Sequence, residues 1–138
     1  MKLSDLQIGF FKEVNRSFSR SEVVAFAELS GDINPIHLNP EFAKNTIFKA
    51  PIVHGMLYSS LLSSLIANEL PGPGSIYKSQ TLHFKAPVFY DEPVTARVAV
   101  KEVLVGKGIC ILETIVFKSN NPEIIVVTGE AVIKKIEA

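Results

Sequence analysis

One long stretch of the 138-residue sequence, residues 55 to 69, has a helical pattern with no charged side chain before Glu69 at its end. A Pro-Gly-Pro-Gly run at 71–74 follows and ends the helix. Two rows recur at helical spacing, one of large apolar residues (Leu57, Tyr58, Leu61, Leu62, Leu65 and Ile66) and one of small residues (Gly55, Ser59, Ser63 and Ala67). Because neither side carries charge, we expect this helix to be buried on nearly all sides.

From Ser75 onward the hydrophobic period changes to two, as in residues 94–101, which predicts half-buried strands. Similar runs at about 75–90, 109–118 and 123–135 are separated by turn formers and indicate an antiparallel meander, and residues 10–18 are a further candidate strand. We therefore predict one α+β domain over residues 1–138, in which the sheet curls around the helix. An open sheet edge and an exposed apolar rim favour a homodimer.

The charge of the chain excludes several classes of protein. The 14 Lys+Arg against 14 Asp+Glu give a net charge of +0, which argues against binding to nucleic acid or to anionic lipid. With one cysteine and three histidines, no cluster of zinc-ligand spacing occurs, so we expect a metal-free protein of a reducing, cytoplasmic compartment. The most apolar window, residues 52–67, is too short and too polar for a membrane span, and the N-terminus has no secretory pattern.

Asp32 and His37 are the one carboxylate and imidazole that lie close in sequence outside a long helix. Ser19 and Glu22 form a capping box for a helix at about 20–29, and Asn39 offers a cap for a second short helix, so the linker between them is expected to be irregular. The pair could share one water, the imidazole exchanging protons near neutral pH. The alternative is that Asp32 caps a turn and His37 is a buried polar residue with its hydrogen bonds satisfied.

Gly55 opens the long helix, whose first backbone N–H groups have no partner within the helix. A carbonyl oxygen could approach these donors closely, and an oxyanion there would be stabilised by them and by the helix dipole. The alternative is a glycine needed only for a tight helix start. His54 and His83 have no acidic or cysteine neighbour in sequence and are interpreted as structural, and Cys110 as a small core residue.

Several segments together resemble the MaoC-type (R)-specific enoyl-CoA hydratases over essentially the whole chain. They are residues 26–37 (FAELSGDINPIH), 51–56 (PIVHGM), 70–77 (LPGPGSIY), 84–88 (FKAPV) and 127–132 (VTGEAV). The Asp-x-Asn-Pro-Ile-His element, residues 32–37, is the specific part. The resemblance implies a hot-dog fold, a homodimer, and no cofactor.

The resemblance further implies reversible syn hydration of a trans-2-enoyl thioester, carried by coenzyme A or by an acyl carrier protein, to the (R)-3-hydroxyacyl thioester. It places the catalytic pair on Asp32 and His37, carbonyl binding on Gly55, and substrate binding on Ser63. The side chain of Ile66, which by its spacing is core, would help to shape the acyl pocket. The rivals are a hot-dog thioesterase, a 3-hydroxyacyl carrier-protein dehydratase, and a non-catalytic acyl-thioester binding subunit.

Overall fold

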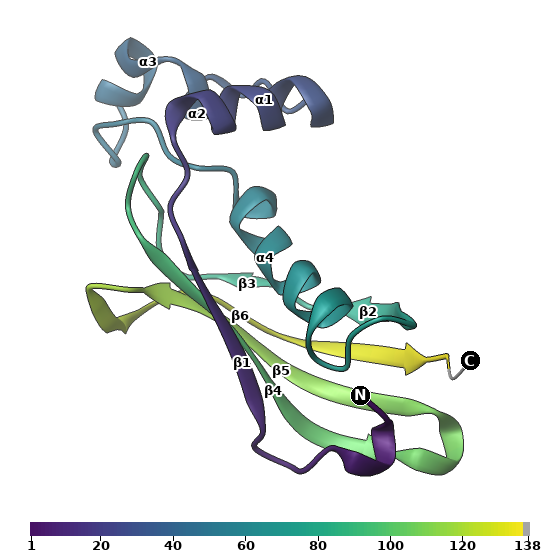
Figure 1. Ribbon diagram of the computed structural model, residues 1–138. Helices are drawn as coiled ribbons and strands as arrows, with labels where there is room; N and C mark the ends of the chain where they lie inside the picture. Colours follow the sequence, from purple (N-terminus) through teal and green to yellow (C-terminus); the bar gives the residue numbers. More distant parts are fainter. Residues whose placement is uncertain (137–138) are drawn as a thin grey trace.

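The computed structural model describes residues 1–136, and in it a curved antiparallel sheet lies against one long helix (Figure 1). The strands are β1 (Phe11–Arg16), β2 (Ser75–Gln80), β3 (His83–Phe84), β4 (Val94–Leu104), β5 (Ile109–Lys118) and β6 (Asn121–Lys135). The helices are α1 (Arg20–Ser30), α2 (Pro35–Leu38), α3 (Pro40–Lys44) and α4 (Gly55–Asn68), with 3-10 turns η1 (Leu3–Asp5) and η2 (Val105–Lys107). The α+β architecture predicted from the sequence is confirmed.

The sheet order is β1-β4-β5-β6-β2, with β3 also paired to β6. The meander β4-β5-β6 was predicted correctly, but the expectation of one strand over 75–90 that joins it in chain order is wrong. That segment forms two short strands, and both pair with β6 at the far edge. Between these two strands the chain passes close to β6, where a Cβ on Gly129 would lie 1.8 Å from the carbonyl oxygen of Thr81.

Helix α4 packs its large side chains onto the concave face of the sheet. Leu62 and Leu65 are 1% and 2% exposed, and they belong to one core with the inward-facing residues of β4. The expectation that α4 is buried on nearly all sides is wrong for this chain, since the sheet covers only one side. The open side carries the exposed residues of the helix, which are mostly small: Met56, Ser60, Ser63, Ser64, Ala67 and Asn68. None of the helices in residues 1–136 is long and apolar enough to cross a membrane.

Helices α1, α2 and α3 gather beyond the N-terminal end of α4 (Figure 1). The predicted capping box at the start of α1 is present, with Ser19 and Glu22 bonding each other's backbone N–H groups. The expectation that His37 lies on an irregular linker is wrong. Asn34 accepts a hydrogen bond from the N–H of Ile36, and Pro35 occupies the first helical position, so His37 lies in the single turn of α2.

Candidate active site

Asp32 is held just beyond the C-terminal end of α1. Gly31 ends that helix in the left-handed conformation (φ 81°) and donates its N–H to Ala27, as at many helix ends. The N–H of Asp32 then donates to the hydroxyl of Ser30 at 3.1 Å, and its carboxylate accepts from the N–H of Asn34 at 3.3 Å. The carboxylate is thereby fixed by its own turn while its side chain stays exposed.

His37 is buried, and its ring is fixed by one hydrogen bond. Its Nδ1 lies 2.8 Å from the carbonyl oxygen of Ile52. A carbonyl oxygen only accepts, so Nδ1 carries the hydrogen, and Nε2 of the neutral ring holds a lone pair. The hydroxyl of Tyr90 donates to the carbonyl of His37, and the N–H of Ile52 donates to Ile36, which ties α2 to the segment that leads into α4.

Burial is the main reason why the pKa of His37 lies below its ordinary value of 6.5. The hydrogen bond to the Ile52 carbonyl and the charge of Asp32 favour the protonated ring and oppose this effect, while nearby His54 adds to it. His37 is therefore a neutral acceptor at neutral pH.

The start of α4 presents unpaired backbone donors. The first backbone hydrogen bonds of the helix are donated by the N–H groups of Leu57 and Tyr58 to the carbonyl oxygen of His54. The side chain of His54 makes no capping bond. The N–H groups of Gly55 and Met56 have no hydrogen-bond acceptor within residues 1–136. A Cβ at position 55 would lie 2.6 Å from Cε1 of Phe84, so the structure gives an additional reason for the glycine: the aromatic ring lies against it.

Asp32, His37 and Gly55 line one pocket of about 480 Å³ at the N-terminal end of α4. The rest of its wall is mostly apolar and includes Phe84 from β3. Asp32 supplies the one carboxylate among the lining residues. The pocket thus places hydrogen-bond acceptors, at Asp32 and His37, in the same cavity as the free N–H of Gly55.

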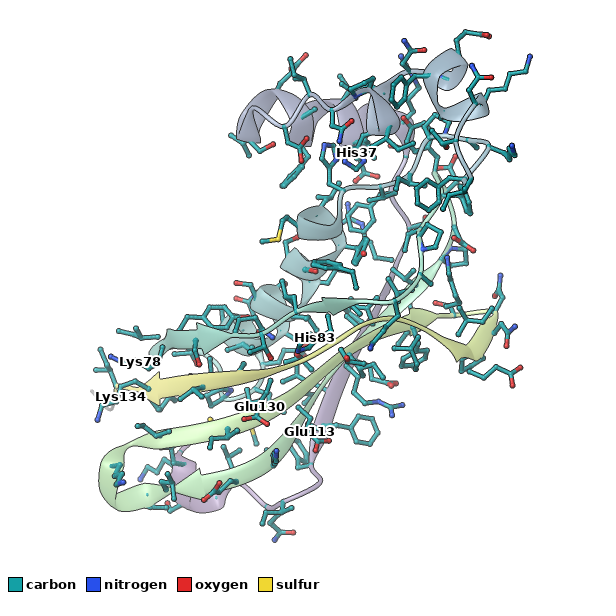
Figure 2. The ribbon with its side chains drawn as sticks, turned by 180° about the vertical axis from the view of Figure 1, so that it is seen from behind. His37, Lys78, His83, Glu113, Glu130 and Lys134 are labelled. Atoms are coloured by element: carbon teal, nitrogen blue, oxygen red, sulfur yellow. The ribbon has the colours of Figure 1, made fainter. Side chains whose placement is uncertain are left out.

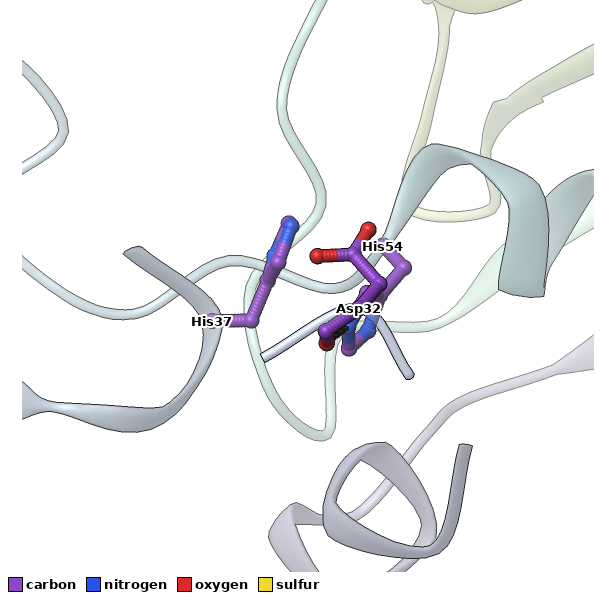
Figure 3. Close-up of side chains that lie close together, drawn as sticks. All are labelled: Asp32, His37 and His54. Atoms are coloured by element: carbon purple, nitrogen blue, oxygen red, sulfur yellow. Dashed lines mark hydrogen bonds between the residues drawn. The ribbon is translucent and has the colours of Figure 1, made fainter. Parts of the chain in front are cut away.

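His54 lies beside the pair, a contact that the sequence did not predict (Figure 3). Its ring stacks on that of His37, with centroids 3.8 Å apart and planes at 24°. Ligand atoms of Asp32, His37 and His54 lie within 4.8 Å of one another, as in some metal sites. The arrangement does not suit an ion, because imidazole lone pairs lie in the ring plane and two nearly parallel rings do not converge on one point about 2.1 Å away.

The other residues predicted for the site lie elsewhere. Ser63 is on the open side of α4, Ile66 is 2% exposed in the core, and neither lines the pocket, so their roles stay predictions. His83 lies on the sheet, apart from His37 (Figure 2). Sequence reasoning missed Phe84 at the pocket and took His54 as structural, because the partners of both residues are distant in sequence.

Three comparisons with known proteins agree with one another. The family model described as "MaoC like domain" matches residues 7–120. The chain is 47% identical to an (R)-specific enoyl-CoA hydratase of Aeromonas caviae, over 97% of this chain and 98% of that protein. A solved structure of an A. caviae (R)-hydratase superposes with a TM-score of 0.90 at 47% identity, covering 96% of this chain and 98% of that one.

Two further relatives bear on the range of the family. R-Hydratase PhaJ1 of Pseudomonas aeruginosa superposes with a TM-score of 0.90 at 39% identity, over 99% of this chain and 86% of that one. A mitochondrial 3-hydroxyacyl-[acyl-carrier-protein] dehydratase of Arabidopsis thaliana is 38% identical, over 91% of this chain and 75% of that protein.

The lowered pKa of His37 predicts a specific titration. By NMR, its ring should gain a proton with a midpoint below 6.5 in the folded protein, and should return to the ordinary value in urea. Because the unfolded chain then binds more protons, the free energy of unfolding should fall as the pH drops below 6.5 through the folded pKa. The negative charge of Asp32 favours the protonated ring of His37, so Asp32→Asn should lower the midpoint further. A folded midpoint at or above 6.5 would contradict this account of the site.

Proposed function

The chain belongs to the MaoC-like domain family, and from this premise we infer that it is an (R)-specific enoyl-CoA hydratase of hot-dog fold. It adds water reversibly to trans-2-enoyl-CoA thioesters and forms (R)-3-hydroxyacyl thioesters. The observation that carries this function is the pocket in which Asp32, His37 and Gly55 meet. Close full-length relatives with this activity by name support the same conclusion.

Asp32 and His37 hold the water that reacts. Both the carboxylate and Nε2 of the neutral imidazole are acceptors, so they bind the two protons of one water and leave its oxygen lone pairs free for the β-carbon. As the C–O bond forms, one proton passes to the pair and the electrons of the double bond move toward the thioester carbonyl. The pair then gives a proton to the α-carbon. Because both additions come from one side of the substrate, the hydration is syn.

The N–H of Gly55 stabilises the negative charge that this step creates. When water adds to the β-carbon, negative charge develops on the thioester oxygen, and an uncapped helix start stabilises it through the N–H and the helix dipole. The same donors would serve a thioesterase on the same carbonyl. An acidic residue on the central helix is typical of that rival, and α4 itself carries none.

Asp32→Asn and His37→Gln should each lower kcat at least about 100-fold while the protein stays folded, since each removes an acceptor for the water. The assay follows the loss of conjugated ultraviolet absorbance of trans-2-butenoyl-CoA, with chiral analysis of the product. Asp91→Asn and His83→Gln make the same chemical changes outside the pocket and should leave the rate unchanged. A near-normal rate in Asp32→Asn or His37→Gln removes that residue from the mechanism, and release of free thiol without hydration would favour a thioesterase.

The Gly55 donor is tested by Gly55→Pro against Gly55→Ala. Both variants meet the Phe84 ring with a Cβ, but only proline removes the N–H. Proline fits the first position of a helix, and the preceding His54 (φ −57°, ψ 133°) already has a backbone conformation that proline accepts. We expect kcat of Gly55→Pro to be about 100-fold or more below that of Gly55→Ala. Equal rates in the two variants would exclude the donor role.

We further propose that two copies of this chain pair through the open side of α4 and the neighbouring sheet edge. Small residues on that side allow close approach of a second helix, and Ile76, Tyr77 and Phe84 at the edge are 40–50% exposed. Such a dimer would cover Ser63 and enclose the acyl chain there. The mass in solution at micromolar concentration should therefore be that of a dimer.

The pairing surface is tested by a charged substitution. Ala67→Arg, on the open side of α4, should yield monomers, because it places a cation in the proposed interface. Ala25→Arg, at an exposed position of α1, is the matched control and should stay dimeric. Sedimentation equilibrium distinguishes the two masses. A monomeric wild type would rule out the dimer, and a dimeric Ala67→Arg would move the interface elsewhere.

A further inference from the structure

His54 contacts both members of the proposed catalytic pair without lining the pocket. Its Nε2 lies 2.9 Å from the backbone carbonyl oxygen of Asp32, and its ring stacks on the ring of His37. On another side the ring meets the edge of Phe26, with centroids 4.9 Å apart. The side chain is 1% exposed and does not line the pocket, so a substrate there does not reach it.

The hydrogen bond fixes the form of the His54 ring. Because the Asp32 carbonyl only accepts, Nε2 carries the hydrogen and Nδ1 holds a lone pair. Nδ1 is buried and has no hydrogen-bond partner among the described residues.

A residue chosen only to fill this space would not be a histidine. Leucine or phenylalanine would pack without an orphan nitrogen, and buried polar atoms without partners are uncommon enough to require a reason. His54 also occupies the N-cap of α4, where serine, threonine or aspartate is preferred, and its side chain does not cap. The imidazole has one polar contact here, and that contact holds the main chain of Asp32.

We propose that His54 is a positioning residue for the hydration: its N–H holds the main chain of Asp32, and its ring supports the ring of His37. The carboxylate and Nε2 of His37 then keep one fixed spacing to the water. This inference rests on the proposed function, since it assigns His54 a role in the same reaction. His54 acts through Asp32 and His37 and does not touch the substrate.

Two substitutions separate the two contacts. His54→Phe keeps a flat ring against His37 and loses the N–H, whereas His54→Gln keeps an N–H donor within reach of Asp32 and loses the ring. A displacement of about 1 Å in a reacting geometry costs up to about 100-fold in rate, so we expect each variant to lose about 10- to 100-fold in kcat. His54→Leu, which removes both contacts, should lose more than either. KM for trans-2-butenoyl-CoA should stay within about twofold of wild type, because His54 does not line the pocket.

A role limited to stability would give a different result. Val23→Ala removes two methyl groups from a fully buried core residue of α1 and serves as the control, with a lowered Tm and an unchanged kcat. If His54→Phe and His54→Gln behave like this control, the positioning role is wrong. Circular dichroism at the assay temperature establishes that each variant is folded. If only one of His54→Phe and His54→Gln folds, that variant alone suffices for the test.

The wild-type rate distinguishes a failure of the positioning role of His54 from a failure of the proposed hydratase function. Wild type that does not hydrate the substrate overturns the proposed function and this role with it. Wild type that hydrates while both His54 variants keep full kcat overturns the positioning role alone. A loss in kcat at unchanged KM, with partial retention in His54→Phe or His54→Gln relative to His54→Leu, supports it.

Discussion

The packing of α4 onto the concave face of the sheet fixes where that helix begins, and the beginning of the helix is the centre of the site. Burying a leucine such as Leu62 or Leu65 contributes about 1.5–3 kcal/mol, so the core as a whole holds α4 in one position. The sheet also determines what meets the helix start. Because Phe84 of β3 pairs with Val127 of β6, its ring comes to lie against Gly55. The register of the sheet thus shapes the wall of the pocket.

The parts of the molecule that local signals control were predictable from the sequence. The capping box at Ser19, the bounds of α4, and the grouping of Asp32, His37 and Gly55 at one pocket all follow from neighbouring residues or from the family motif. The pairing of β2 and β3 with β6 was not predictable, since it joins segments about 45 to 60 residues apart in sequence. His54 was missed for a related reason: its partner is a main-chain carbonyl 22 residues away, and every residue type has one.

The pocket contains two kinds of hydrogen-bonding group. Acceptors, namely the Asp32 carboxylate and Nε2 of His37, suit a water molecule that must lose a proton. Donors at the uncapped start of α4 suit an oxygen that gains charge. The depressed pKa of His37 keeps its ring an acceptor at neutral pH, and a protonated ring would instead compete with the water for the carboxylate. Addition of water to a polarised double bond needs both kinds of group together.

Several features at the start of α4 are unfavourable for folding alone. The helix lacks a side-chain cap, His54 buries a nitrogen that has no partner among residues 1–136, and the imidazole of His37 is largely buried. A serine or an aspartate at position 54 would cap the helix, but its oxygen would occupy the helix-end donors and leave Asp32 without its hydrogen bond. These local costs are small beside the apolar burial along the rest of α4, so the fold tolerates them. Features that are unfavourable for folding persist at functional sites where the surrounding packing is strong enough to hold them. At the start of α4 such features coincide with groups that the reaction uses.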